Sequence, residues 1–171
     1  MLALPFASLR NVSLGSAWFD ALKVQAIQQL GAGRNGKLQL QFTNRYWNQA
    51  GAWGVGNGTF FADTGCQAGW EPTRAYAGAS GILVKYTGGS IADGLQLRHP
   101  YGNSANSASV RTDAAQFLTE LEPLYPGISS RYNGLAAGSM AHRNQFWNSS
   151  YCYWRVGQAQ RFGGYEQARQ G

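Results

Sequence analysis

The sequence predicts an α+β domain, because segments with helical periodicity alternate with segments that have the two-residue period of a strand. Residues 18–30 place apolar side chains at helical spacing, with glutamines on the opposite face. Residues 37–42 (KLQLQF) alternate polar and apolar side chains, as a half-buried strand does. A second helix is expected at residues 112–122, where Pro123 ends an apolar stripe. The length of 171 residues suits one ordinary domain.

The other segments carry weaker local signals. The opening LALPF is a short apolar run and predicts a strand, and Gly31 is expected to end the first helix in a left-handed conformation. We expect a hairpin in the glycine-rich and aromatic residues 51–64, a central strand at 81–86, a loop at 93–110, and strand and loop at 130–155.

The composition excludes several classes of protein. Hydrophobic residues make up 44% and aromatic residues 13% of the chain, which is too apolar for a disordered protein. The net charge is +6, but the eleven Arg and three Lys are spaced singly along the chain rather than clustered, so we expect no nucleic-acid partner. No stretch approaches the roughly 18 apolar residues of a membrane span, so we expect none.

Metal and disulfide chemistry find little support in the sequence. His99 and His142 lie far apart, with no carboxylate spacing typical of a metal site, so no metal is expected. The two cysteines, Cys66 and Cys152, leave one disulfide open as a possibility.

The segment Gly31–Gly36 (GAGRNG) matches G-x-G-x-x-G letter for letter. A dinucleotide site needs a strand before this motif and a helix after it, so that the helix N-terminus faces the pyrophosphate. Here a helix is predicted before it and a strand after it, and no acidic residue follows about 20 residues later. We therefore interpret the motif as a helix-to-strand loop.

Lys37 and the aromatic cluster near the C-terminus each have two interpretations. Lys37 shares a strand face with Gln39 and Gln41, so it is either a solvated strand-edge lysine or a lysine pointing into a polar pocket, ready to handle protons or water. The cluster Tyr151, Tyr153 and Trp154 either packs in a core or forms a cage for a flat or cationic ligand.

Six segments together resemble the flavin-containing amine oxidases, which include monoamine, polyamine and L-amino-acid oxidases. Their order and spacing along the chain carry the resemblance. They are LPFASLR (4–10), KVQAIQQLG (23–31), KLQLQFTNRYW (37–47), WEPTR (70–74), GASGIL (78–83) and SYCYWRVGQ (150–158).

The resemblance implies the fold of the family's substrate-binding domain, a mixed sheet of about six strands flanked by helices. It implies that residues 1–10 are a terminal strand of a missing FAD domain, that residues 11–150 are the substrate-binding domain, and that residues 151–171 return toward the FAD domain.

The resemblance also implies an activity and the residues that perform it. The activity is FAD-dependent oxidative deamination of an amine or L-amino acid, with hydride transfer to flavin N5 and reduction of O2 to H2O2. Lys37 would be catalytic, reaching flavin N5 through a water, and Lys37 and Trp154 would contact the cofactor. The implied substrate-binding residues are Trp70, Tyr151, Tyr153 and Trp154.

The sequence departs from the family in lacking both segments that hold FAD, an N-terminal G-x-G-x-x-G unit and a C-terminal segment of the type FAGEH. We therefore expect a fragment or one piece of a split enzyme, inactive and without bound FAD when isolated, with a second chain supplying the FAD domain. The expected small-molecule partner is an amine or amino acid, and the expected location is cytoplasmic, with secretion left open. Two alternatives remain: a standalone small-ligand binding module, and an unrelated α+β domain without catalysis.

Overall fold

The computed structural model describes residues 4–33, 35–51, 54–95, 101–140 and 152–162. The chain divides into two compact units, which are described separately. One unit combines Met1–Arg34 with Ala141–Gly171, and the other is Asn35–Met140.

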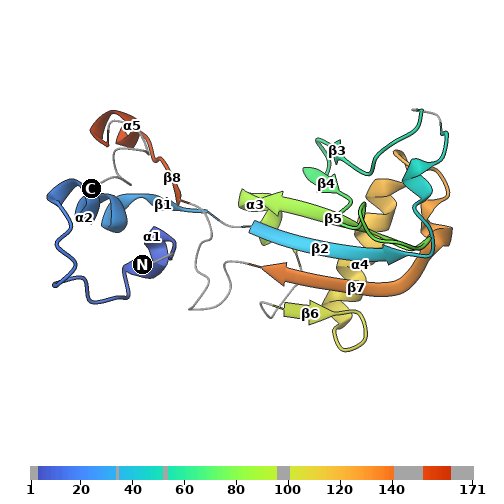
Figure 1. Ribbon diagram of the computed structural model, residues 1–171, viewed down its shortest axis with the longest axis horizontal. Helices are drawn as coiled ribbons and strands as arrows, with labels where there is room; N and C mark the ends of the chain where they lie inside the picture. The colour runs from blue at the N-terminus through green and yellow to red at the C-terminus, as the bar shows by residue number, and fades with distance from the viewer. Residues whose placement is uncertain (1–3, 34, 52–53, 96–100, 141–151, 163–171) are drawn as a thin grey trace. The chain divides into compact units, whose positions relative to one another are not determined.

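The Asn35–Met140 unit, here called the sheet unit, is built on a six-stranded sheet (Figure 1). The spatial order is β3-β4-β5-β2-β7-β6, and every neighbouring pair is antiparallel. The mixed sheet implied by the resemblance is therefore corrected to an antiparallel one, because each strand runs opposite to its neighbours. The strands are β2 (Asn35–Phe42), β3 (Phe60–Phe61), β4 (Ala68–Trp70), β5 (Gly81–Gly88), β6 (Tyr101–Asn103) and β7 (Tyr132–Met140).

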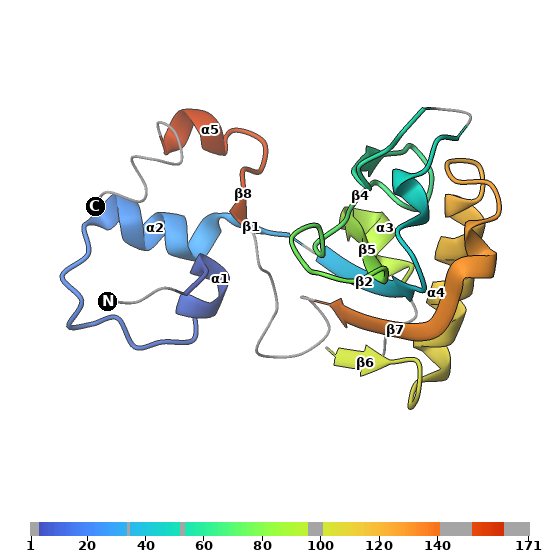
Figure 2. The same cartoon turned by 45° about the vertical axis from the view of Figure 1, so that its right-hand side comes forward.

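Helix α4 (Ala108–Leu121) covers one face of this sheet (Figure 2). Its Phe117 and Leu121 share a core with Leu38 and Leu40 of β2, and all four side chains are fully buried. Shorter helices complete the unit: η1 (Tyr46–Asn48), α3 (Gly89–Asp93) and η2 (Ile128–Arg131). The opposite face of the sheet carries no helix of this unit among the described residues, and we call it the open face.

The other unit has its own small core. It contains α1 (Phe6–Leu9), α2 (Ala21–Gln29), β1 (Gly31–Ala32), β8 (Cys152–Tyr153) and α5 (Gln158–Arg161). The buried side chains are Phe6, Leu9, Ala26, Ile27, Leu30 and Phe162. Asp20 caps α2 by accepting a hydrogen bond from the backbone N–H of Lys23 at 2.9 Å. None of the described helices is both long and apolar enough to cross a membrane.

Two predictions at the start of the chain are wrong. Residues 6–9 form a short helix instead of a strand, since Phe6 and Leu9, three residues apart, both enter the core. Gly31 does not end α2 in a left-handed conformation but lies in β1, opposite Tyr153. Glycine is required at this position, because a Cβ would come within 2.5 Å of the Tyr153 ring.

Three further segments differ from their predicted structure. Among the described residues of 51–64 no hairpin forms: an isolated bridge joins Gly51 to Gly54, and β3 pairs with β4. The predicted loop at 93–110 contains β6. Helix α4 begins at Ala108 because the Ser107 side chain caps it, four residues before the predicted start at Thr112.

Candidate functional site

Strand β2 places Lys37 on the open face of the sheet. Leu38, Leu40 and Phe42 are fully buried on the α4 side, whereas Lys37 and Gln39 are exposed. The predicted alternation is therefore confirmed. Because β2 lies between β5 and β7 in the sheet, Lys37 belongs to an inner strand and not to an edge strand. Its side chain is exposed, so both the solvated lysine and the lysine facing a polar pocket stay open as interpretations.

The strand register aligns a row of residues across the open face. Lys37 lies opposite Tyr86 of β5, which lies opposite Ala68 of β4, which in turn lies opposite Phe61 of β3. Directly paired residues on neighbouring strands project to the same face. The row therefore places two aromatic side chains on the β5 side of Lys37.

Lys37, Trp70 and Tyr86 form a compact group that we call the lysine–aromatic site. The Lys37 Nζ lies 5.5 Å from the centroid of the Trp70 ring and 5.9 Å from that of the Tyr86 ring. The two rings are 5.8 Å apart and inclined at 51°. These distances allow cation–π attraction, worth about 0.5–1 kcal/mol at an exposed position. The Tyr86 hydroxyl donates a hydrogen bond to Asn35 Oδ1 at 2.8 Å, which fixes the direction of the ring.

The electrostatics of this site are those of an uncompensated cation. In the part of the chain that the structure describes, no carboxylate pairs with Lys37. The half-buried rings of Trp70 and Tyr86 supply apolar faces beside the ammonium group. Such a group can order a water molecule, stabilise negative charge or bind a flat ring. The residues of the lysine–aromatic site fit a flavin, because the flavin ring is flat and gains electron density on reduction.

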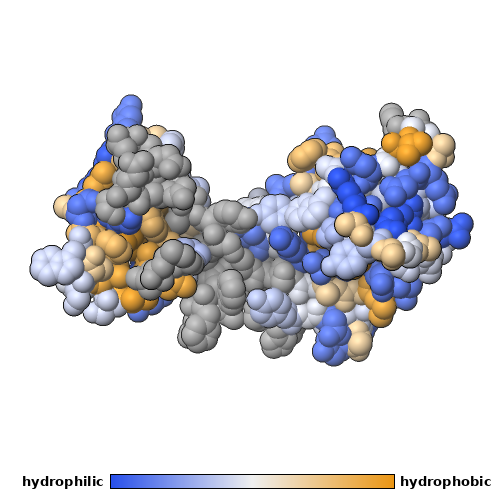
Figure 3. Space-filling view, viewed as in Figure 1, coloured by the Kyte–Doolittle hydropathy of each residue, from blue (hydrophilic) through white to orange (hydrophobic). Residues whose placement is uncertain are grey.

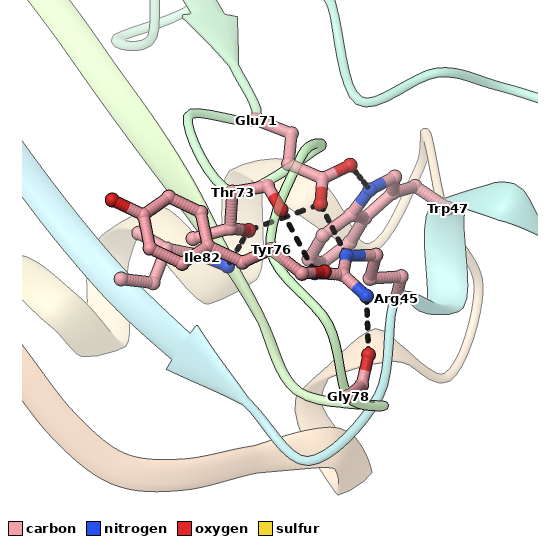
Figure 4. A network of polar contacts seen from close by, with 7 residues as sticks. All are labelled: Arg45, Trp47, Glu71, Thr73, Tyr76, Gly78 and Ile82. Carbon is pink, nitrogen blue, oxygen red and sulfur yellow. Dashed lines mark hydrogen bonds and ion pairs between the residues drawn. The ribbon is translucent and has the colours of Figure 1, made fainter.

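A buried polar network holds the chain that follows Trp70 (Figure 4). The Glu71 carboxylate accepts hydrogen bonds from Arg45 Nε at 2.6 Å and Trp47 Nε1 at 2.7 Å. The Arg45 guanidinium also donates to the carbonyl oxygens of Thr73 at 2.8 Å and Tyr76 at 3.0 Å. The loop between β4 and β5 is thereby attached to the segment Arg45–Trp47, which follows β2.

The Glu71 pKa reflects this network. Burial by itself would raise the pKa, but hydrogen bonds from Trp47, Arg45 and Thr73, together with the Arg45 charge, outweigh burial and lower it below 4.5. Glu71 is therefore an ionised buried carboxylate that is hydrogen-bonded to Arg45, Trp47 and Thr73 and anchors the chain next to Trp70.

A second buried ion pair lies on the α4 side of the sheet. Lys85 Nζ is 2.6 Å from Glu120 Oε2, and the two side chains are 4% and 11% exposed. Nearby Cys66 is a free, buried cysteine, and burial raises the pKa of its thiol to about 12. A protonated buried thiol is a poor nucleophile, so Cys66 is a packing residue of the core, while Lys85 and Glu120 join α4 to the sheet.

The predicted site residues fall into three groups. The structure brings Lys37 and Trp70 together in the lysine–aromatic site. Tyr153 and Trp154 are 51% and 43% exposed in the other unit, and their place in a site with Lys37 stays a prediction. Tyr151 lies outside the described residues, as do His99 and His142. Among the described residues, no cluster of His, Cys, Asp or Glu could hold a metal ion.

Sequence reasoning missed Tyr86, although a signal for it was present. The predicted strand at 37–42 contains Lys37 and the predicted strand at 81–86 contains Tyr86, but the sequence did not show that these two strands are neighbours. Arg45 and Glu71 were missed for the same reason, since 26 residues separate the two partners.

Comparison with known proteins supports the fold. No protein-family model and no curated protein match the sequence. Solved structures do match. Cyclohexylamine oxidase from Brevibacterium oxydans IH-35A aligns with 85% of this chain at 16% identity and a TM-score of 0.63, over 29% of its own length.

Putrescine oxidase gives similar matches. Its wild type bound to putrescine aligns with 95% of this chain at 17% identity and a TM-score of 0.65, and a triple mutant aligns with 95% at 19% identity and a TM-score of 0.68. This chain spans about a third of the length of these putrescine oxidase chains. The fold of this chain is therefore similar to part of the fold of amine oxidases.

Proposed function

We propose that this chain is the substrate-binding part of an FAD-dependent amine or L-amino-acid oxidase, with Lys37 as its catalytic residue. One observation carries the proposal: Lys37 stands on the open face of an amine-oxidase-like sheet, with its ammonium group over the rings of Trp70 and Tyr86. The similarity of fold to cyclohexylamine oxidase and putrescine oxidase supports the reaction class.

The proposal gives each residue of the site a physical role. Bound FAD would accept the hydride of the amine carbon and pass the electrons to O2. Lys37 would hold a water molecule and place a positive charge where negative charge develops. Trp70 and Tyr86 would form an apolar wall that excludes bulk water and orients the substrate.

The proposal also gives roles to the aromatic residues near the C-terminus and to the parts that would bind FAD. Tyr151, Tyr153 and Trp154 would complete the substrate wall, and Trp154 would also contact the cofactor. The FAD-binding parts would come from a second chain or from further sequence, because this chain matches only about a third of the length of its structural neighbours.

The test is the Lys37→Met substitution in a complete enzyme. This enzyme is either the complex with the chain that supplies the FAD parts or a putrescine oxidase chimaera carrying Asn35–Met140. Met keeps the length of the side chain and removes its charge. Loss of a well-placed electrostatic group costs about 10²–10³ in rate, so we expect flavin reduction or reoxidation, followed by stopped-flow absorbance, to slow at least tenfold.

Lys23→Met is the matched control for a full-chain complex, because Lys23 lies on α2 and outside the lysine–aromatic site. It should leave both half-reactions unchanged. If Lys37→Met also leaves both rates unchanged, Lys37 is a solvated strand residue and the catalytic assignment is wrong.

A further inference from the structure

The open face carries a second feature, a cavity of about 370 Å³ lined by residues of β2, β5, β6 and β7 and of the loops beside them. Its polar lining includes the side-chain amides Gln39, Gln41 and Asn103, and its apolar lining includes Ile82, Leu135 and Ala137. Among the described residues that line it, none is charged. The oxidase proposal does not use this cavity.

A β-bulge shapes the cavity. On β2 the residues Leu40 and Phe42 are two apart, whereas their partners on β7, Ala136 and Tyr132, are four apart. The extra residues of β7 turn through Gly134, whose φ is +85°. Bulges of this kind bend a strand away from its partner and often lie beside functional sites. The bulge therefore lies beside the cavity, which Ala136 helps to line.

The amides around the hollow offer more unpaired donors than acceptors. Asn103 Oδ1 accepts hydrogen bonds from the backbone N–H groups of Ala105 at 3.0 Å and Asn106 at 3.1 Å, which leaves its NH2 group available. Gln41 Oε1 accepts from Asn133 Nδ2 at 3.0 Å, which likewise leaves an NH2 group. Gln39 forms no hydrogen bond within the described part of the chain, so both its carbonyl and its NH2 remain available.

These groups suit a ligand that both accepts and donates hydrogen bonds. An ammonium ion would meet no opposite charge among the described residues that line the cavity. A carboxylate could accept from the NH2 groups but has no N–H to donate to the Gln39 carbonyl. A neutral carbonyl oxygen can accept from the free NH2 groups, and a neutral N–H can donate to the Gln39 carbonyl. The apolar side chains suit a short hydrocarbon stem.

We propose that this cavity binds an uncharged small molecule that carries a carboxamide on a short aliphatic stem. Its carbonyl accepts from the NH2 groups of Asn103 and Gln41, its N–H donates to Gln39, and its stem contacts Ile82 and Leu135. Binding at this site requires neither flavin nor amine oxidation, so the test of binding is independent of the proposed oxidase function.

Two probes of equal shape test the proposal on the isolated chain: isovaleramide and isovalerate, of which only the amide carries an N–H that can donate to Gln39. In the ¹⁵N-labelled protein we expect isovaleramide to shift the side-chain NH2 resonances of Gln39, Gln41 and Asn103 in a saturable manner. The dissociation constant for isovalerate should be about tenfold higher, because it cannot make the hydrogen bond to the Gln39 carbonyl.

Two variants locate the site. Asn103→Asp keeps the Oδ1 acceptor of the turn but replaces the donating NH2 with an oxygen, and Gln39→Leu removes an exposed amide at similar size. Each should weaken isovaleramide binding about tenfold or more, the loss expected for an unpaired polar contact. Gln28→Leu, at an exposed amide of α2, is the control and should bind as the wild type does.

The outcomes separate clearly. No saturable shift at concentrations on the order of 100 mM, where a ligand of this size should bind detectably, would overturn the proposal. Equal binding of the two probes, or equal loss in the Gln28→Leu control, would also overturn it. Should Asn103→Asp lose the dispersed spectrum of a folded protein, the exposed Gln39→Leu variant decides the question.

Discussion

Two lysines on neighbouring strands show how position decides the role of a residue. Lys85 faces α4 and is held by Glu120 at 2.6 Å, whereas Lys37 faces the open side and contacts the rings of Trp70 and Tyr86. Lys85 pairs across the strands with Leu38, the neighbour of Lys37, so a single step along β2 separates the two environments. The buried pair joins α4 to the sheet, and the open lysine can meet a ligand.

At the same scale, Arg45 is expected to be essential for stability. Arg45→Met would leave the Glu71 carboxylate buried without its cation, and breaking a buried pair in this way typically costs about 3–5 kcal/mol. Urea unfolding should show a loss of that size. Arg74→Met, at an exposed arginine outside the pair, should cost less than about 1 kcal/mol, and equal losses for the two variants would contradict the role assigned to Arg45.

Glu71 also predicts a dependence of stability on pH. Its pKa lies below 4.5 in the folded protein, so the folded state holds the proton less tightly than the unfolded state does. The stability contributed by the ionised carboxylate is therefore present above pH 4.5 and is lost as the pH falls through the folded pKa.

Glu71→Gln should accordingly flatten the decline in the free energy of unfolding between about pH 5 and pH 3, while being less stable than the wild type at pH 7. Asp63→Asn, at an exposed carboxylate without an ion pair in the described part of the chain, should follow the wild-type curve. A Glu71→Gln curve parallel to that of the wild type would show that this carboxylate does not control acid stability.

At the scale of elements, the short strands β3 and β4 depend on a glycine. A Cβ at Gly69 would come within 2.2 Å of the Phe60 ring and 2.7 Å of the Val84 carbonyl oxygen. Phe60 is a core residue, so its ring covers Gly69 and seals this end of the sheet. Trp70 follows directly, so the packing of Gly69 also sets the position of the lysine–aromatic site.

Gly69→Ala should therefore destabilise the protein by about 1–3 kcal/mol, the usual cost of overpacking. The matched control is Gly15→Ala, because nothing lies within 4 Å of the position that its Cβ would take and its φ is not left-handed. Thermal unfolding should place Gly69→Ala well below the wild type and Gly15→Ala close to it. A Gly69→Ala midpoint at the wild-type value would mean that Phe60 moves aside without cost.

At the scale of the whole molecule, a low charge density is combined with exposed aromatic side chains. Only 13% of residues are charged, and hydrophilic or intermediate side chains cover much of the visible surface of the sheet unit (Figure 3). On its open face, however, Phe61 is 82% and Tyr101 67% exposed. Phe61 continues the row of Ala68 and Tyr86, and a contiguous apolar patch of this kind typically marks a contact surface.

We therefore expect the isolated chain to self-associate as its concentration rises. Phe61→Ser should reduce this association, because it removes the most exposed ring of the row that includes Lys37. Gln28→Ser, on α2, is a control that should leave association unchanged. Light scattering that shows a concentration-independent monomer for the wild type would contradict the expectation.

The sequence by itself determined the alternating faces of β2, the helix at α2 and the order of helix before strand around Gly31–Gly36. Each of these depends on neighbours within a few residues, so periodicity and the order of elements suffice to predict them. The resemblance of short segments added the expectation of an amine-oxidase-like fold. The fold of this chain is similar to parts of cyclohexylamine oxidase and putrescine oxidase.

Only the tertiary structure decided which strands are neighbours and in which register. The pairing of β2 with β5 and of β5 with β4 brings Lys37, Tyr86 and Trp70 together, although 49 residues separate the first two. The helix at Phe6–Leu9 and the bulge in β7 likewise depend on contacts that local sequence does not encode. Such features follow from long-range packing, whose free energy exceeds the weak preferences of single residues.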